Sequence, residues 1–519
     1  MNRRDWLRMA TAASLGQLGS LSKAAPLLEV DPFQLGVASG MPSATGIVLW
    51  TRLLPLNTLR NPWGDAPLDV RWELADDAAF SKLVRTGIAQ ALPQLAHSVH
   101  VEVEGLEPGR HYHYRFLVGG AVSPTGRTRT LPAPDEPVQR LRLGVASCQR
   151  LANGYFGAYS RMLEENLDAM TFLGDYIYDS GAWPSAILPR GLEPARTLDG
   201  YRLHYETHKR EQALQEAHAA LPWLLIWDDH EVLNDYAGSP ARGLAPGTEA
   251  RQRRAAYQAY YEHMPLRLAS LVRGMQGLTQ DGEELRIYGR AQWGQLASMH
   301  LLDCRQYRDA QACSGVGGMI ETPVCDAMLD PKRTMLGAEQ EAWLHAGLAK
   351  QRRGEGQAWN LLLQTTMFSP RKIPVLGKQR VWNDGWDGYP AARERLIASL
   401  VGQDVAGPVF IGGDLHENWA CNVPGGSVEA ARQTVASEFV VTGITMSSFF
   451  PKMIADIKAA NPHAQFAQAG KCGYAVVEVT PKQVQTSFMT VNSIATLEPT
   501  VSLAARFNVE AGDPKLVAG

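Results

Sequence analysis

The chain has 519 residues, which is long enough for more than one domain. Its composition is that of an ordinary globular protein, with 45% hydrophobic and 20% charged residues. A formal net charge of −3 gives no general basic field, which argues against nucleic acid as the main partner. No internal stretch has the length and apolar character of a transmembrane segment.

The first 28 residues have the layout of an export signal. Arg3 and Arg4 precede an aromatic–aliphatic pair, and a mildly apolar run follows from residue 9 to residue 21. This order favours a twin-arginine signal that is cleaved near Ala25, and the alternative is a short amphipathic helix. We therefore expect the twin-arginine translocase to be a partner during export, and the mature protein to be periplasmic or secreted.

Residues 29–136 predict a small all-β domain. Short apolar or alternating runs occupy residues 46–52, 69–74, 98–104 and 111–117, and turn residues such as Pro108 and Gly109 separate them. Such runs indicate an antiparallel sandwich. The segment 103–109 before a tyrosine-rich strand resembles fibronectin type III modules. No catalytic constellation occurs here, and we expect His111 and His113 to pack rather than to bind a metal ion.

A linker with three prolines at residues 131–137 leads into an α/β part, residues 137–500. Predicted strands alternate with predicted helices, and this order indicates a layered α/β core. The predicted strands are residues 141–147, 169–174, 224–227, 286–288, 296–303, 359–365, 408–414, 438–442 and 474–480. The predicted helices are residues 155–166, 198–220, 251–263, 337–349 and 391–401. Residues 304–335 are expected to form a long loop, and residues 501–519 a weakly structured C-terminal tail.

Four predicted strands run into side chains that can bind metal ions. Open α/β sheets place their ligands at the carboxyl ends of the strands, because unpaired carboxylates are costly to bury within a strand. Taken alone, an aspartate there is usually a helix cap, a histidine a packing residue and a cysteine a small buried group. The same layout in four strands predicts one metal cluster instead. The residues at these ends are Cys148, Asp175, Tyr178, Asp228, Asp229, His230, Glu231, Asp414 and His416.

The other cysteines carry different expectations. Cys313 and Cys325 lie in a glycine-rich loop of an exported chain, so a disulfide between them is reasonable, although sequence does not determine the pairing. We expect Cys304, Cys421 and Cys472 to be buried and free.

The motifs around the four strand ends resemble those of the alkaline phosphatase D (PhoD-type) family, a branch of the calcineurin-like metallophosphoesterases. The most telling are Gly174-Asp175-Tyr176 and the segment 227–231, which reads Trp-Asp-Asp-His-Glu. Cys148 stands where the wider superfamily has an acidic ligand, and Asp414 where it has a histidine. The matching segments are residues 33–39, 49–53, 146–149, 174–178, 227–235, 302–307, 336–344, 386–389 and 413–416.

This resemblance implies a layered α/β/β/α metallophosphoesterase core, preceded by the small fibronectin III-like sandwich. It implies Fe³⁺ and Ca²⁺ as cofactors, and a metal-activated hydroxide or oxo group that attacks phosphorus in line. The residues implied on the iron side are Cys148, Asp175, Tyr178 and Asp414. Those implied at a second metal ion or the phosphate are Asp229, Asn234 and His416. Asp235, next to Asn234 in the sequence, could supply a further oxygen ligand or phosphate contact.

The expected activity is that of an alkaline phosphatase or phosphodiesterase acting on small phosphate esters or phosphodiesters. His230 is the expected catalytic residue, which protonates or otherwise assists the leaving alkoxide. Arg150 and Arg305 are candidate contacts to the substrate phosphate, and a structural or surface salt bridge is the alternative for both. Two other functions stay open: a phospholipase D-like hydrolase of lipid head groups, and a non-catalytic binding protein on the same scaffold.

Overall fold

The computed structural model describes residues 31–55, 63, 66–180, 192–238, 248–270, 285–313, 322–375, 377–425, 433–448 and 451–519. The predicted export signal, residues 1–28, lies outside them. The chain divides into two compact units. Unit 1 comprises Met1–Leu131, Tyr201–Trp223 and Arg254–Arg286, and unit 2 comprises Pro132–Gly200, Leu224–Arg253 and Ile287–Gly519.

Unit 1 contains the predicted all-β domain. Three strands pair antiparallel in the order β1 (Val37–Gly40), β2 (Gly46–Arg52) and β5 (Ser98–Glu104). A second antiparallel sheet has the order β4-β3-β6-β7, and β8 pairs with β6. Its strands are β3 (Leu68–Ala75), β4 (Leu83–Ala91), β6 (His111–Val118), β7 (Ala121–Val122) and β8 (Gly126–Arg129). Alternate residues of both sheets, such as Leu49, Val101, Val70 and Tyr114, meet in one hydrophobic cluster.

The predicted helix over residues 198–220 is two helices, α3 (Leu198–Lys209) and α4 (Gln212–Ala220). The interruption falls at Glu211, whose backbone is extended with ψ 121°. Helix α5 (Thr248–His263) agrees with the prediction for residues 251–263. None of the described helices is long and apolar enough to cross a membrane.

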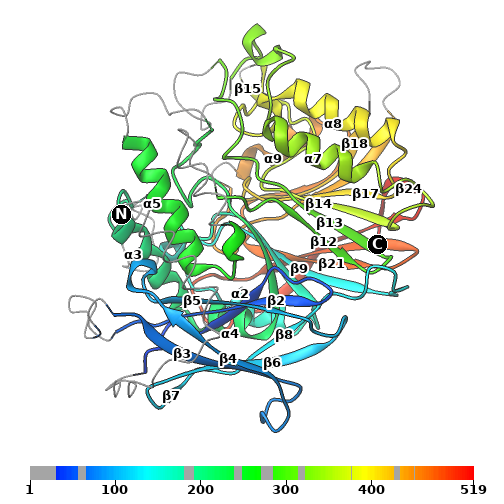
Figure 1. Cartoon of the computed structure of the whole chain (residues 1–519). Helices are drawn as coiled ribbons and strands as arrows, with labels where there is room; N and C mark the ends of the chain where they lie inside the picture. Colours follow the sequence, from blue (N-terminus) through cyan, green and yellow to red (C-terminus); the bar gives the residue numbers. More distant parts are fainter. Residues whose placement is uncertain are drawn as a thin grey trace. The chain divides into compact units, whose positions relative to one another are not determined.

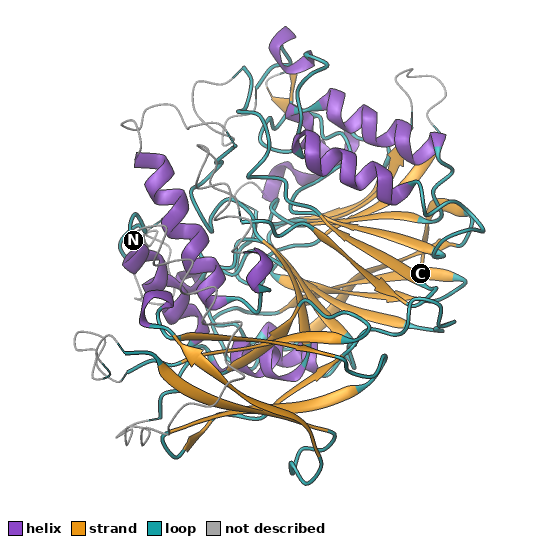
Figure 2. Cartoon of the chain, viewed as in Figure 1, coloured by secondary structure: helices purple, strands orange, loops and turns teal. Residues whose placement is uncertain are grey.

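Unit 2 is built on two extensive sheets (Figures 1 and 2). In one, the strands follow the order β24-β23-β22-β21-β9-β10-β11, and β9 and β10 are parallel. They are β9 (Leu141–Ala146), β10 (Ala169–Leu173), β11 (Pro222–Ile226), β21 (Gly473–Val479), β22 (Gln483–Val491), β23 (Val501–Glu510) and β24 (Asp513–Ala518). Strand β11 belongs to unit 2 only from Leu224 onward.

The other sheet has seven strands in the order β12-β13-β14-β17-β19-β18-β20. Strands β13, β14, β17 and β19 run parallel to one another. The strands are β12 (Gly289–Trp293), β13 (Ala297–Leu301), β14 (Trp359–Leu363), β17 (Pro408–Gly412), β18 (Asn418–Pro424), β19 (Thr434–Val440) and β20 (Ala464–Gln468). A separate hairpin joins β15 (Ile373–Val375) and β16 (Lys378–Arg380).

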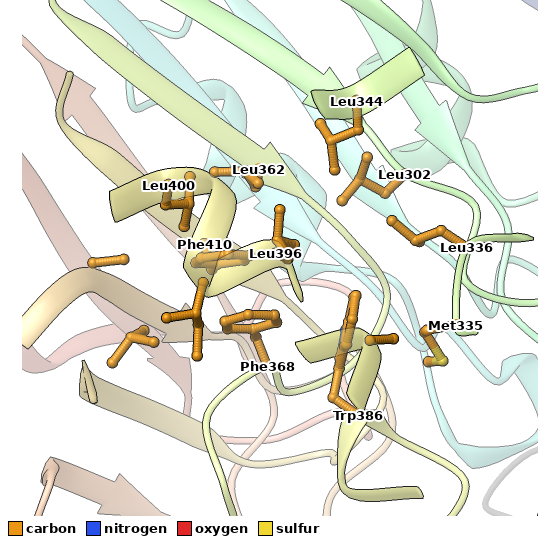
Figure 3. Packing of buried hydrophobic residues seen from close by; sticks show 14 of the residues in the cluster. Leu302, Met335, Leu336, Leu344, Leu362, Phe368, Trp386, Leu396, Leu400 and Phe410 are labelled. Atoms are coloured by element: carbon orange, nitrogen blue, oxygen red, sulfur yellow. The ribbon is translucent and has the colours of Figure 1, made fainter. Parts of the chain in front are cut away.

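The seven-stranded sheet carries a helical layer. Helices α7 (Gly337–Leu348) and α8 (Pro390–Gly402) place Leu344 and Leu396 in the same buried cluster as Leu362 of β14 and Phe410 of β17 (Figure 3). Aromatic rings connect the two sheets of unit 2, since the rings of Phe439 (β19) and Phe488 (β22) lie 6.1 Å apart between centroids. The remaining helices are α2 (Ala158–Leu163) and α9 (Ile454–Ala459), with short 3-10 turns η1 (Pro93–Leu95), η2 (Leu151–Asn153), η3 (Asp326–Leu329), η4 (Trp386–Gly388) and η5 (Pro451–Met453).

Two predictions of secondary structure are wrong. The supposedly weak tail, residues 501–519, forms strands β23 and β24, which turn at Gly512 with φ 91°. Phe507 and Val509 of β23 are both buried, so the alternation of its side chains with the strand period anchors the tail. The strand expected at residues 286–288 begins only at Gly289.

The cysteine predictions are confirmed. Cys313 and Cys325 form a disulfide. Cys304, Cys421 and Cys472 are free and buried, and so is Cys148.

Candidate active site

The four ligand-bearing strand ends lie within unit 2. Strands β9, β10 and β11 are neighbours in one sheet, and they lead into Cys148, Asp175 and Asp228. Strand β17 leads into Asp414 from the seven-stranded sheet. Each strand is largely apolar and buried, and each of these four side chains belongs to the second residue after the strand end. The two sheets therefore contribute different members of one site.

Four of the candidate ligands adopt a left-handed backbone conformation. The φ angles are 53° at Cys148, 60° at Asp175, 62° at Asp414 and 56° at His416. This region costs an L-residue about 1–2 kcal/mol, and such strain gathers at functional sites. The strained positions coincide with the residues that the sequence had singled out for their chemistry.

One group of possible metal ligands contains Cys148, Asp175 and His416, whose donor atoms all lie within 4.8 Å of one another. Tyr178 belongs beside them, because its hydroxyl donates to Asp175 Oδ2 over 2.8 Å and lies 3.4 Å from His416 Nε2. Cys148 and Tyr178 also pack against Met446 in a small buried cluster. A thiol, a carboxylate, a phenol and an imidazole thus converge on one point.

Two further groups share Asp229. One joins it to Asp175 and His230, and the other joins it to Asp235 and Asp384. The backbone N–H of Asp235 donates to Asp229 Oδ2 over 2.6 Å.

The structure separates two neighbours that the sequence offered together as oxygen ligands, and it adds one member that the sequence did not make evident. Asn234, a predicted ligand, is exposed, whereas its neighbour Asp235 lies among the carboxylates. Asp384 was not singled out, although it lies in an aromatic and acidic stretch before α8. No spacing pattern connects it to Asp229, and only the tertiary fold brings the two together.

Arg305 is fully enclosed by this acidic set. Its side chain is 1% exposed, its Nε donates to Asp228, and its Nη1 lies 2.5 Å from Asp384 Oδ2. Its Nη2 lies 4.0 Å from Asp414 Oδ1. These ion pairs favour the alternative interpretation of Arg305 as a structural cation over a contact to substrate.

Two other arginines lie beside residues of the site: Arg308 beside a carboxylate, and Arg150 beside an aromatic ring. Arg308 is buried and pairs with Asp384 Oδ1 over 2.5 Å. The guanidinium carbon of Arg150 lies 5.6 Å from the centre of the Tyr178 ring.

The site gathers several buried carboxyl groups. Burial raises the pKa of Asp175 well above its usual value, that of Asp228 to about 7 and that of Asp414 to about 6. Among the described residues, Asp175 Oδ1, Asp228 Oδ2 and Asp414 Oδ2 are buried without a hydrogen-bond partner. Unpaired buried oxygens of this kind are costly unless a cation completes them, so the donor set fits metal ions.

His230 lies beside this group. Its Nδ1 lies 2.8 Å from Asp179 Oδ1, and Asp179 Oδ2 accepts from Arg196 over 3.2 Å. The imidazole is 15% exposed, and its ring centre lies 4.3 Å from that of Tyr178. Burial alone would lower the pKa of His230, but Asp229, Asp175 and Asp179 raise it well above its usual value. The arrangement holds a protonatable imidazole in a fixed orientation next to the acidic group.

Comparisons with known proteins relate the whole chain to characterised ones. The sequence model of a family described as "PhoD-like phosphatase" matches residues 143–488, and that of "PhoD-like phosphatase, N-terminal domain" matches residues 20–132. Alkaline phosphatase D of Bacillus subtilis (strain 168) is 39% identical in an alignment of 495 residues that covers 93% of this chain and 81% of that protein. A solved structure described as "Structure of PhoD" has 37% identity and a TM-score of 0.87, and the match covers 95% of this chain and 93% of that one.

Proposed function

The chain belongs to the PhoD-like phosphatase family and is an enzyme of the alkaline phosphatase D type, and from this premise we propose that it hydrolyses small phosphate monoesters and diesters with metal ions bound at the strand ends. The convergence of Cys148, Asp175, Tyr178 and His416 on one point carries the proposal. Thiolate and phenolate donors suit ferric iron, whereas carboxylate oxygens suit Ca²⁺.

We assign the ligands in two sets. Cys148, Asp175, Tyr178 and Asp414 would hold Fe³⁺, and the grouping with Cys148 supports adding His416 to this set. Asp229, with Asp235, Asp384 and the exposed Asn234, would hold Ca²⁺. When bound, such ions neutralise phosphate oxygens and supply water of lowered pKa.

The protein's own residues complete the chemistry. With Nδ1 donating to Asp179, His230 would hold a proton at Nε2 for the leaving alkoxide. Arg196 on the other oxygen of Asp179 supports the charge of that carboxylate. Arg150 remains the proposed contact to a phosphate oxygen, and Arg305 orients Asp228 and Asp384.

Two features of architecture belong to the same proposal. We assign residues 29–136 to the sandwich domain, and we extend the predicted catalytic domain, residues 137–500, to residue 519 because β23 and β24 pair onto β22. We also assign the catalytic domain to the α/β/β/α layering of metallophosphoesterases. The two sheets of unit 2, with α7 and α8 on one of them, support this layering.

Metal removal tests the function. The purified enzyme is expected to hydrolyse p-nitrophenyl phosphate or its bis ester at alkaline pH, and exhaustive chelation is expected to abolish this. Returning Fe³⁺ with Ca²⁺ should restore turnover and a visible absorption band from the thiolate and phenolate. Full activity in protein shown by elemental analysis to be metal-free would contradict the proposal.

Two further assays on the metal-loaded protein distinguish the two other functions. Release of the head group from phosphatidylcholine, with no turnover of nitrophenyl esters, would favour the phospholipase D-like alternative. Binding of phosphate esters without turnover, in fully metal-loaded protein, would favour the binding protein.

Export by the twin-arginine route is part of the proposal, and it places the mature enzyme in the periplasm or outside the cell. The double substitution Arg3→Lys with Arg4→Lys keeps both positive charges but removes the pair of guanidinium groups. We expect it to leave the activity in the cytoplasm on cell fractionation. Unchanged extracytoplasmic activity of the double variant would refute this route.

A further inference from the structure

We propose that Glu231 is a positioning residue, whose carboxylate fixes the loop after β10 against the loop after β11 and so sets the spacing of the metal ligands. This inference rests on the proposed function. Glu231 closes the Asp-Asp-His-Glu segment, but none of the roles assigned so far uses it. Its side chain is completely buried.

The carboxylate accepts hydrogen bonds from three backbone N–H groups. Glu231 Oε1 accepts from Tyr176 N over 2.5 Å. Glu231 Oε2 accepts from Asp175 N over 3.1 Å and from Asp228 N over 2.9 Å. Two of these donors belong to the loop after β10 and the third to the loop after β11. One side chain therefore ties both loops together.

The loop after β10 has a conformation that needs such an anion. Gly174 and Asp175 both have positive φ, 103° and 60°. Successive backbone N–H groups in a turn can point toward one side and form a concave anion-binding surface. In this chain, the carboxylate of Glu231 fills that surface.

The two loops touch at the same place. A Cβ added to Gly174 would lie 2.4 Å from the Cβ of Asp228 and 2.5 Å from its backbone nitrogen. The glycine permits this approach, and the carboxylate of Glu231 satisfies the buried donors that the approach brings together.

The Glu231 bridge lies next to residues of the proposed metal site in the sequence and in the fold. Asp175 is a proposed ligand, and Asp229 directly follows the bridged Asp228. The donor atoms of Asp175, Asp229 and His230 all lie within 4.8 Å of one another. Because both oxygens of Glu231 accept from backbone N–H groups, it acts through these residues and is not itself assigned as a ligand.

Glu438 on β19 offers a matched control. It is also completely buried, and it accepts from the backbone N–H groups of Phe368 over 2.5 Å and Ser369 over 2.7 Å. The burial is the same and the carboxylate again accepts from backbone N–H groups, but Glu438 has two donors instead of three, and neither belongs to a proposed ligand.

The experiment compares Glu231→Gln, Glu231→Asp and Glu438→Gln in the full chain. Glutamine keeps the size of Glu231 but turns an amide N–H₂ toward at least one of the backbone donors. Loss of an outer contact around a metal commonly costs about 10–100-fold in affinity or activity. We expect Glu231→Gln to weaken Fe³⁺ or Ca²⁺ binding and to lower kcat by about this factor. The visible band should also move, since Asp175 shares the iron with Cys148 and Tyr178.

Glu231→Asp keeps two acceptor oxygens on a shorter arm and should lie between wild type and Glu231→Gln. Glu438→Gln should lower the melting temperature but keep metal affinity, kcat and the band. If Glu231→Gln does not fold, the metal affinity, kcat and visible band of Glu231→Asp test the inference in its place.

The inference would be overturned if the Glu231 variants kept the metal affinity, the kcat and the visible spectrum of the wild type, whatever the melting temperatures of these variants. Equal losses of metal affinity in Glu231→Gln and Glu438→Gln would overturn it too. Failure of the wild type itself to bind metal or hydrolyse esters would contradict the proposed function instead, so the two failures are distinguishable.

Discussion

Substitution of Asp175 by asparagine is expected to abolish turnover while the fold is retained. Asp175 belongs to two of the three ligand groups, so its loss weakens both metal positions together. The fall in kcat should exceed the roughly 100-fold that loss of an outer contact around a metal costs. The assay is hydrolysis of bis(p-nitrophenyl) phosphate, with bound iron and calcium measured in the same samples.

Although Asp175→Asn should lose turnover, it should not destabilise the metal-free protein at neutral pH. Burial and neighbouring carboxylates raise the pKa of Asp175, so the folded state holds its proton more tightly than the unfolded state does. Stability of the metal-free wild type therefore falls as the pH rises from 3.8 through the raised pKa. Asparagine has no proton to lose, and Asp175→Asn should melt at an equal or higher temperature than metal-free wild type at neutral pH.

Asp168 supplies the control. It precedes β10, whereas Asp175 follows it, and Asp168 Oδ2 accepts from the backbone N–H of Arg142 over 2.8 Å. Asp168→Asn should keep the metal content and kcat of the wild type. Wild-type turnover and metal content in Asp175→Asn would remove Asp175 from the site.

Substitution of His230 by asparagine is expected to lower kcat by about 10²–10⁴-fold, the usual contribution of a general acid or base. The loss should depend on the leaving group. An alkoxide needs a proton to depart, whereas p-nitrophenolate is stable without one. We therefore expect a large loss with alkyl phosphates and a much smaller loss with p-nitrophenyl phosphate.

Asp179→Asn should produce the same dependence on the leaving group in weaker form, because it removes the carboxylate that orients Nδ1. His345→Asn on α7 controls for the loss of an imidazole elsewhere in the chain and should leave both rates unchanged. Equal losses with alkyl and nitrophenyl esters in His230→Asn would contradict proton donation by His230.

The sequence predicts much of this site because the chain changes character abruptly at each strand end. An apolar run that stops at Asp175 or Asp414 has few physical explanations, and parallel strands bring their carboxyl ends to one edge. Cys148 and Asp175 accordingly lie together, and His416 joins them from the end of β17 in the other sheet. Strands β3, β5 and β6 of the all-β domain were also predictable, since the alternation of their side chains fits a half-buried sheet.

What sequence could not predict depends on long-range contacts. Asp384 joins Asp229 from a segment that no motif marks, and Arg305 meets its carboxylates only in the folded chain. The strands β23 and β24 were missed because their exposed residues dilute the alternation. Their order comes from pairing with β22.

The division of the ligands between two sheets has a consequence for the mechanics of unit 2. Cys148 and Asp175 follow strands of one sheet, and Asp414 and His416 follow β17 of the other. Ions held by both sets would act as a reversible cross-link between chain segments that are distant in sequence. Unlike a disulfide, such a link is absent from the unfolded chain, and ligand binding to the folded state adds stability in proportion to the logarithm of the free ion concentration. Metal supply would then govern how long the folded enzyme survives heat and proteases, as well as how fast it turns over.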